Sequence, residues 1–222
     1  MKLAVAGRSN IAWFKLADVV SRGEKERALS IYRLFAYSFR DDALSAQVEG
    51  DILCMFNDER ALESYRRAAR LYMRANDLTH AIFLYELMCE LSPQAYDLHN
   101  QLFYWSVESS DPTRMISSGV SLLMLLARRN AWAEIEEIIP TSIATAGALK
   151  ATIVQNFIVQ ALAEGIDITE DYLEKLLMHS IAKHATKGAG AHADPQVSAF
   201  LSQLAGLDDN LHAIARARIA DM

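Results

Sequence analysis

Apolar residues recur at helical spacing through most of this chain, most clearly over residues 61–93. Residues three and four apart share a helix face, so each apolar stripe there predicts a helix with one buried side. Asn76 can adopt the left-handed conformation that ends a helix, and Asp77 can cap the next one. The stretch therefore predicts a helical hairpin, which needs neighbours to cover its apolar faces. The first stripe is Leu62, Tyr65, Ala69, Tyr72 and Met73, and the second is Leu78, Ala81, Ile82, Tyr85, Met88 and Leu91.

Upstream, the same periodicity predicts helices over residues 10–21, 25–39 and 43–56. Gly23 is expected to end the first, Asp41 or Asp42 to cap the third, and Asn57-Asp58 to separate the third from the hairpin. The residues expected to face inward are Trp13, Leu16, Val19, Val20, Ala28, Ile31, Tyr32, Phe35, Leu44, Val48, Ile52, Leu53 and Phe56.

Downstream, the pattern predicts helices over residues 94–109, 112–129, 131–139, 146–163, 169–186, 196–205 and 208–220. Asp111-Pro112 is a strong helix start, because proline suits the first turn of a helix. The helix that follows is apolar almost all round, which is typical of a central helix. Residues 188–195 (GAGAHADP) are predicted to form a linker, and no strand is expected anywhere in the chain.

Counted from Leu62, the hairpin resembles a tetratricopeptide repeat, through Ala69, Tyr72, Asn76, Ala81, Tyr85 and Pro93. It departs from that pattern at Tyr65, Ala68 and Met88. A second, weaker copy of the repeat lies upstream and includes Gly23, Ala28 and Tyr32. A second phase, based on Ala28, Ala61 and Ala95, is less favourable because it places Phe83 where two helices must approach closely. The resemblance implies an all-α fold of antiparallel helical hairpins stacked as a TPR-like α-solenoid, with extra C-terminal helices.

This interpretation divides the chain into five parts. Residues 1–9 are expected to form a leader, 10–129 a TPR-like repeat region, 130–187 a helical extension, 188–195 a linker, and 196–222 a pair of capping helices. A stack of helical hairpins must cover its last apolar face, which is the role expected of the two capping helices.

The composition limits the possible functions. A net charge of −6 gives no general attraction to nucleic acid or to anionic membranes. Cys54 and Cys89 lie in apolar helical patterns, which favours reduced core thiols. The N-terminus has no secretory signal pattern, and the most apolar stretch, residues 115–127, is too short to span a bilayer. We expect a cytoplasmic protein that binds neither nucleic acid nor membranes.

Arginines gather on one helix of the hairpin, with Arg66, Arg70 and Arg74 at i, i+4 and i+8 and Arg67 beside them. Like charges at that spacing repel, so acids or an anionic ligand should compensate. The resemblance implies that this helix lines a groove, in which Arg66, Arg67, Arg70 and Arg74, with Asn100, Gln101 and Tyr104, would bind an acidic segment or a C-terminal carboxylate. The alternative is a solvated face paired with Glu59, Glu63 and Asp97.

The sequence contains no recognisable catalytic or cofactor motif. His179 and His184 are five residues apart, so they do not share a helix face as a metal-binding pair does. We therefore predict a non-enzymatic scaffold, adaptor or chaperone, without cofactor or metal, that binds a peptide or protein. Two alternatives stay open: a structural subunit that forms a homodimer through the helices from Ala146 onward, and an all-helical enzyme whose site has no sequence signature.

Overall fold

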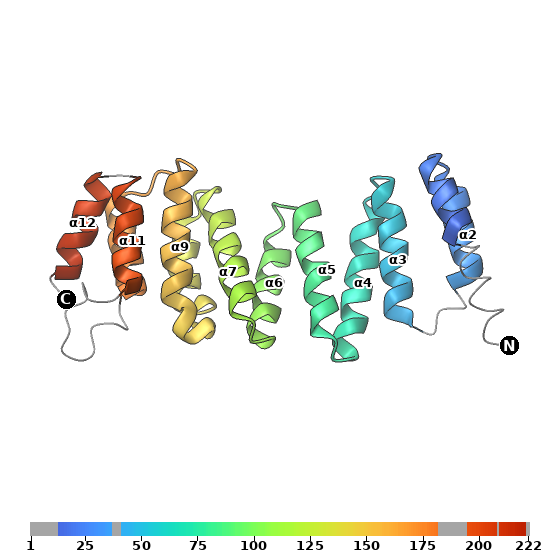
Figure 1. Ribbon diagram of the computed structural model, residues 1–222, viewed down its shortest axis with the longest axis horizontal. Coiled ribbons are helices and arrows are strands. Elements are labelled where there is room, and N and C mark those ends of the chain that lie inside the picture. Colours follow the sequence, from blue (N-terminus) through green and yellow to red (C-terminus); the bar gives the residue numbers. More distant parts are fainter. Residues whose placement is uncertain (1–12, 37–40, 182–194, 208, 221–222) are drawn as a thin grey trace. The chain divides into compact units, whose positions relative to one another are not determined.

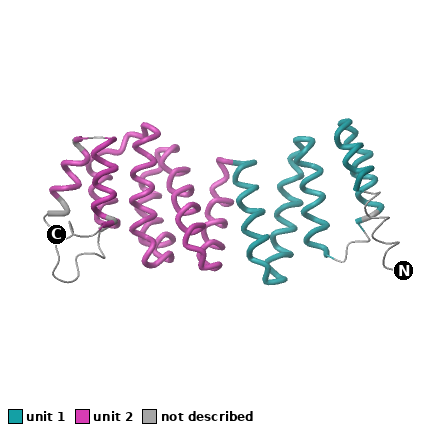
Figure 2. Tube along the Cα trace, viewed as in Figure 1, with its two compact units in different colours: residues 1–92 teal, residues 93–222 magenta. Residues whose placement is uncertain are grey.

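The computed structural model describes residues 13–36, 41–181, 195–207 and 209–220. Every regular element in these ranges is a helix, which confirms the all-α prediction (Figure 1). The predicted leader over residues 1–9 and the predicted linker, apart from Pro195, lie outside the described residues. The chain divides into two compact units, residues 1–92 and 93–222 (Figure 2).

The described residues of the first unit form a succession of helices. A helix over residues 13–21 is followed by α2 (Lys25–Ala36), α3 (Asp42–Met55), α4 (Arg60–Arg74) and α5 (Leu78–Leu91). Helix α3 packs between α2 and α4, and α4 packs between α3 and α5. Helices α4 and α5 form the predicted hairpin, and the centres of its two stripes are buried: Tyr65, Ala69, Tyr72, Ala81, Ile82, Tyr85 and Met88.

The helix ends of this unit follow the sequence signals. Gly23, Asn57 and Asn76 have φ angles of 75°, 51° and 59°, the left-handed conformation that reverses the chain after a helix. The Asp41 side chain accepts hydrogen bonds from two amides in the first turn of α3, and Asp77 accepts one from the first turn of α5. These turns and caps confirm the predicted boundaries at these positions, whereas the predicted start at residue 10 and the predicted end at residue 39 lie outside the described residues.

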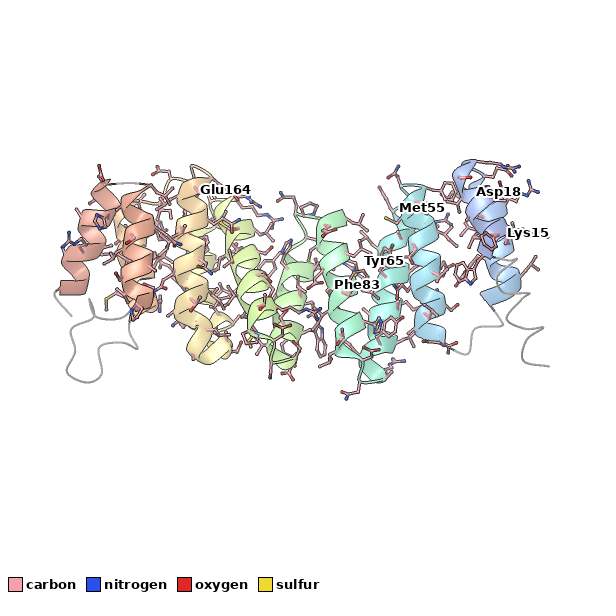
Figure 3. All side chains as sticks on the ribbon, viewed as in Figure 1. Lys15, Asp18, Met55, Tyr65, Phe83 and Glu164 are labelled. Atoms are coloured by element: carbon pink, nitrogen blue, oxygen red, sulfur yellow. The ribbon has the colours of Figure 1, made fainter. Side chains whose placement is uncertain are left out.

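Helices α3 and α4 approach closely at Gly50. A Cβ atom at that position would lie 2.6 Å from Cδ1 of Tyr65, a buried side chain on α4 (Figure 3). The Tyr65 hydroxyl donates to Oδ1 of Asp51 at 2.9 Å, and the Tyr72 hydroxyl donates to Oε1 of Gln47 at 2.9 Å. Both rings are buried as predicted, and α3 supplies the hydrogen-bond acceptors that their polar ends need.

Three residues predicted to face inward are exposed instead. Trp13, Leu44 and Leu91 retain 39%, 38% and 42% of their accessible surface. Each lies in the first or last described turn of its helix, where a neighbouring helix covers less of the surface. The prediction was wrong at these positions because periodicity identifies a face but not how far along the helix that face is covered.

The second unit contains seven α-helices and one 3-10 helix among its described residues. They are α6 (Tyr96–Glu108), α7 (Pro112–Ala127), α8 (Trp132–Ile138), the 3-10 helix η1 (Ile143–Leu149), α9 (Lys150–Ala163), α10 (Glu170–Ile181), α11 (Pro195–Ala205) and α12 (Asp209–Ala220). Helix α7 is central, as predicted, because α6, α8, η1 and α9 all pack against it. Asp111 caps it and Pro112 occupies its first turn.

One predicted helix of this unit is wrong at its start. Residues 146–163 do not form a continuous helix, because Gly147 has φ 59° and ψ −116° and interrupts it. The chain forms a 3-10 turn up to Leu149, and α9 begins at Lys150. Ile143 and Ala146 are buried on this turn, and their apolar spacing does not distinguish it from an α-helix.

Helices α7 and α9 lie directly against each other. A Cβ atom on Gly119 would lie 2.9 Å from Cγ2 of Ile153, so the absence of a side chain at this position of α7 makes room for α9.

No single described helix is both long and apolar enough to cross a membrane. The pair 132–138 and 143–163 meets that test only when taken together, across a bend of 60°.

Candidate functional site

The arginines predicted to bind a peptide lie on α4 of the first unit, and we refer to Arg66, Arg67, Arg70 and Arg74 as the arginine face. Arg67 forms an ion pair with Glu49 of α3. Arg70 Nη2 lies 3.3 Å from Oε1 of Glu63, one of the acids predicted as a partner. Arg74 is exposed and Arg66 is half-buried. Acids of the same unit thus compensate part of this charge.

The fifth arginine of α4, Arg60, has a local partner. Its Nη2 lies 2.6 Å from Oδ2 of Asp58, and Lys25 of α2 pairs with the same carboxylate. Hydrogen bonds from Arg60, and then from Lys25, hold the pKa of Asp58 well below its usual range. Asp58 therefore connects α2 to the turn between α3 and α4, a partner that the sequence did not indicate.

The other residues predicted to bind the peptide lie on α6 of the second unit. Asn100 is half-buried, whereas Gln101 and Tyr104 are exposed. The Tyr104 ring packs edge-on against Trp105, with ring centroids 4.9 Å apart. The arginine face and these residues thus belong to different units, and each is a surface of its own unit.

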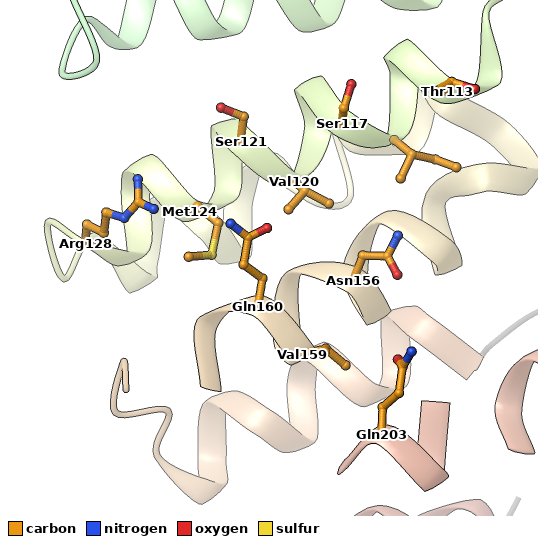
Figure 4. Close-up of a pocket in the computed structure, with 11 residues that line it drawn as sticks. Thr113, Ser117, Val120, Ser121, Met124, Arg128, Asn156, Val159, Gln160 and Gln203 are labelled. Carbon is orange, nitrogen blue, oxygen red and sulfur yellow. The ribbon is translucent and has the colours of Figure 1, made fainter. Parts of the chain in front are cut away.

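A groove in the second unit offers another candidate site, separate from the arginine face. It has a volume of about 640 Å³ and is lined by α7, α9 and Gln203 of α11 (Figure 4). We call it the α7–α9 groove. Its floor is apolar: Val120 and Met124 are buried, and Ile116 and Val159 are half-buried. A concave apolar surface with a few polar groups is the usual form of a binding site.

The rim of the groove carries neutral amide side chains. Asn156 and Gln160 come from α9 and Gln203 from α11, and all three are exposed. Figure 4 shows Gln160 extending from α9 toward α7, beside Met124. Each amide offers two N–H donors and one carbonyl acceptor, so the rim can pair with donors and acceptors of a ligand alike.

An ion pair lies at one end of the groove. The Arg128 guanidinium holds the Glu164 carboxylate through two nitrogens, Nε at 3.0 Å and Nη2 at 2.8 Å. Gln160 Nε2 donates to the same carboxylate at 3.1 Å. These hydrogen bonds, those of Arg128 first, lower the pKa of Glu164. Among the described residues that line the groove, Arg128 is the one with a charged side chain, and it is paired with Glu164.

A buried histidine of α6 contacts a residue of α7 that lines the groove. His99 of α6 is 7% exposed, and its Nδ1 lies 3.1 Å from Oγ of Ser121, which lines the groove. Burial lowers the pKa of His99, the Pro93 backbone partly offsets this, and the positive charges of Arg129 and Arg128 lower it further. The imidazole is therefore neutral at pH 7, and it links α6 to α7 through the serine.

The sequence analysis missed the groove, although the sequence carries a signal for it. Thr113, Ser117 and Ser121 recur every four residues on α7, which is otherwise strongly apolar, and Asn156 and Gln160 do so on α9. Polar residues at i, i+4 on a helix that is otherwise buried mark a stripe left open to solvent. That two such stripes line one groove depends on how α7 packs against α9, which no local pattern shows.

The described residues contain no group of three metal-binding side chains among His, Cys, Asp and Glu. Cys54 and Cys89 are free thiols, half-buried and buried respectively. No known protein-family model matches the sequence, and a search of curated proteins finds no significant match.

Proposed function

We propose that this chain is a non-enzymatic interaction scaffold that holds a polypeptide segment in the α7–α9 groove. The observation that carries the proposal is the combination of an apolar floor with a neutral amide rim. A polypeptide offers both kinds of partner, apolar side chains for the floor and backbone amides for the rim. A site built on packed helices is also held rigidly, which reduces the entropy lost when a ligand binds.

The proposed architecture is a stack of helical hairpins of the tetratricopeptide type, and the proposed role is that of an adaptor or chaperone. Support comes from the α4–α5 hairpin, where Ala69, Tyr72, Ala81 and Tyr85 are buried at the positions that the resemblance assigns to packing. The arginine face is a second candidate surface, for acidic segments. We rank it lower because Arg67 and Arg70 already have acidic partners.

The test is a selection of random peptides displayed on phage, with the full chain as the target. Peptides would be counter-selected on the triple variant Asn156→Ala/Gln160→Ala/Gln203→Ala, and scored in parallel on Arg66→Glu/Arg70→Glu. All five positions lie on exposed or half-buried surface, so both variants are expected to fold, which circular dichroism would check.

We expect peptides that bind the wild type and the arginine variant, and that bind the triple variant at least tenfold more weakly. Peptides lost only on the arginine variant would move the site to α4. An absence of any peptide whose binding depends on the groove would contradict the proposed function.

A further inference from the structure

We infer that His99 makes the attachment of α6 to α7 sensitive to acid, so that α6 opens from its unit more often as the pH falls. This opening would occur whether or not the α7–α9 groove binds a peptide. Three features of the structure carry the inference: the way α6 is attached, the surroundings of the His99 ring, and the contact at the start of α6.

Helix α6 is held in its unit mainly by one neighbour. It packs against α7, whereas α7 also packs against α8, η1 and α9. Leu98, Leu102 and Phe103 of α6 are buried. Phe103 packs at Gly119 of α7, where a Cβ atom would lie 3.1 Å from its Cε2. A helix attached in this way can open while the rest of its unit stays folded, because local opening breaks only the contacts of that helix.

The His99 ring lies within this contact, in surroundings that suit its neutral form. The residue is 7% exposed, and its Nδ1 lies 3.1 Å from Oγ of Ser121 on α7. Nε2 is buried as well and has no hydrogen-bond partner among the described residues. A buried charge without a partner is costly, so a protonated ring would lose its hydration with little compensation.

The charges around the ring also oppose its protonation. Arg129 and Arg128 are the charged groups that act on it, and both are positive, although Arg128 is paired with Glu164. The Pro93 backbone favours the charged ring, but burial outweighs it and keeps the pKa of His99 below its ordinary value. A ring exposed by opening of α6 regains an ordinary pKa, so the open form binds the proton more readily and is favoured as the pH falls.

The start of α6 is held by one of the same arginines. A nitrogen of the Arg129 side chain donates a hydrogen bond to the carbonyl oxygen of Gln94, two residues before α6 begins. A positive charge on His99 would repel the guanidinium that makes this bond. Protonation therefore weakens the attachment of α6 at two places, at the buried ring and at Gln94.

The experiment is hydrogen–deuterium exchange of the full chain, read by mass spectrometry at pH 7 and pH 5 and corrected for the intrinsic pH dependence of exchange. Peptides from residues 96–108 report on α6, and peptides from residues 150–163 report on α9 of the same unit. The test variant is His99→Gln, whose side chain stays neutral across this range. The matched control is His179→Gln, which removes a half-buried histidine of α10.

We expect exchange in α6 to become at least about tenfold faster relative to α9 between pH 7 and pH 5. This acceleration should occur in the wild type and in His179→Gln, and it should be absent in His99→Gln. Equal acceleration of α6 and α9 in the wild type would show that the unit unfolds as a whole, and would overturn the inference. So would an acceleration of α6 that persists in His99→Gln.

A second variant tests the same contact without changing the histidine, and it decides the matter if His99→Gln does not fold. Ser121→Asp replaces the hydroxyl beside the ring with a carboxylate, which gives the charged imidazole a partner. The acceleration of α6 at pH 5 should then be lost or reversed, a result that a general loss of stability does not produce. An unchanged acceleration in folded Ser121→Asp would show that the charge of His99 does not control the opening.

Discussion

The two units place helices close together by the same means, but they treat polar side chains differently. Gly50 brings α3 against Tyr65 in the first unit, and Gly119 brings α7 against Ile153 in the second. In the first unit the polar ends of buried rings are bound by α3, and several arginines have acidic partners. In the second unit neutral amides remain exposed around an apolar floor. Under the proposed function, the polar groups of the first unit serve stability, whereas the exposed amides of the second unit serve binding.

The largest effect is expected at the contact between α3 and α4. Gly50→Ala should lower the free energy of unfolding by about 1–3 kcal/mol, because the new Cβ atom would lie 2.6 Å from the Tyr65 ring. That ring is buried and its hydroxyl is bound to Asp51, so it has little freedom to move. Urea denaturation followed by circular dichroism would measure the change.

Gly206→Ala is the control for this prediction, because the nearest atom to a Cβ there is the Gln203 carbonyl oxygen at 3.5 Å. Its effect should stay within about 0.5 kcal/mol. Helix propensity alone predicts the opposite sign for Gly50→Ala, a gain of up to about 1 kcal/mol. A stabilised variant would therefore show that the close contact does not restrict this position.

The next largest effect is expected from the loss of either of two hydrogen bonds to α3, which differ in the charge of the acceptor. Tyr65→Phe removes a donor from a carboxylate, whereas Tyr72→Phe removes one from the neutral amide of Gln47. Hydrogen bonds to charged groups contribute about 1.5–3 kcal/mol and neutral ones about 0.5–1.5 kcal/mol. At pH 7 Tyr65→Phe should therefore be the more destabilising change in urea denaturation. Equal losses would show that the charge of Asp51 adds nothing to its bond.

Local signals predicted the helix ends because each depends on one or two residues. Asp41, Asp77 and Asp111 cap the helices that follow them, and Asn76 ends α4, as their chemistry indicates. The bend at Gly147 was missed, because the residues on either side of it keep a helical spacing while the backbone does not. A single glycine within an apolar stretch did not distinguish an interrupted helix from a continuous one.

The candidate site was harder to predict, because it depends on which helices become neighbours. The arginine pattern was visible along one helix, but its pairing with Glu49 requires α3 beside α4. The groove requires α7 beside α9, and their contact at Gly119 and Ile153 joins residues far apart in the sequence. Periodicity gives the faces of single helices, and it does not give the partner of each face.

A smaller effect should appear in the pH dependence of the second unit. The pKa of His99 is lowered by burial, so between its folded value and about 6.5 the unfolded chain binds more protons than the folded one. The stabilising contribution of neutral His99 is complete above about pH 6.5 and is lost as the pH falls through the folded pKa. His99→Gln should therefore flatten the fall in unfolding free energy between pH 7 and pH 5.

His179 provides the comparison for this measurement. Burial, and then the charge of Lys150, also lower its pKa, so His179→Gln should flatten the same curve. The two histidines differ in position, because His99 contacts Ser121 of the groove wall. Peptide binding in the groove should weaken at low pH in the wild type and not in His99→Gln. If peptide binding by the wild type and by His99→Gln depends on pH to the same extent, the proposed link between His99 and the groove is wrong.

The smallest effect is expected on the arginine face. Arg70→Ala removes an exposed ion pair with Glu63, which contributes at most about 1 kcal/mol. The same change relieves repulsion from Arg66 and Arg74, one turn before and after it, worth about 0.2–0.5 kcal/mol for each pair. The two terms oppose each other, so the unfolding free energy should change by less than about 0.5 kcal/mol and become less sensitive to salt. Urea denaturation at low and high salt measures both quantities. A loss well above about 1 kcal/mol would instead make Arg70 a structural contact of the first unit and would argue against a role for Arg70 in binding a ligand.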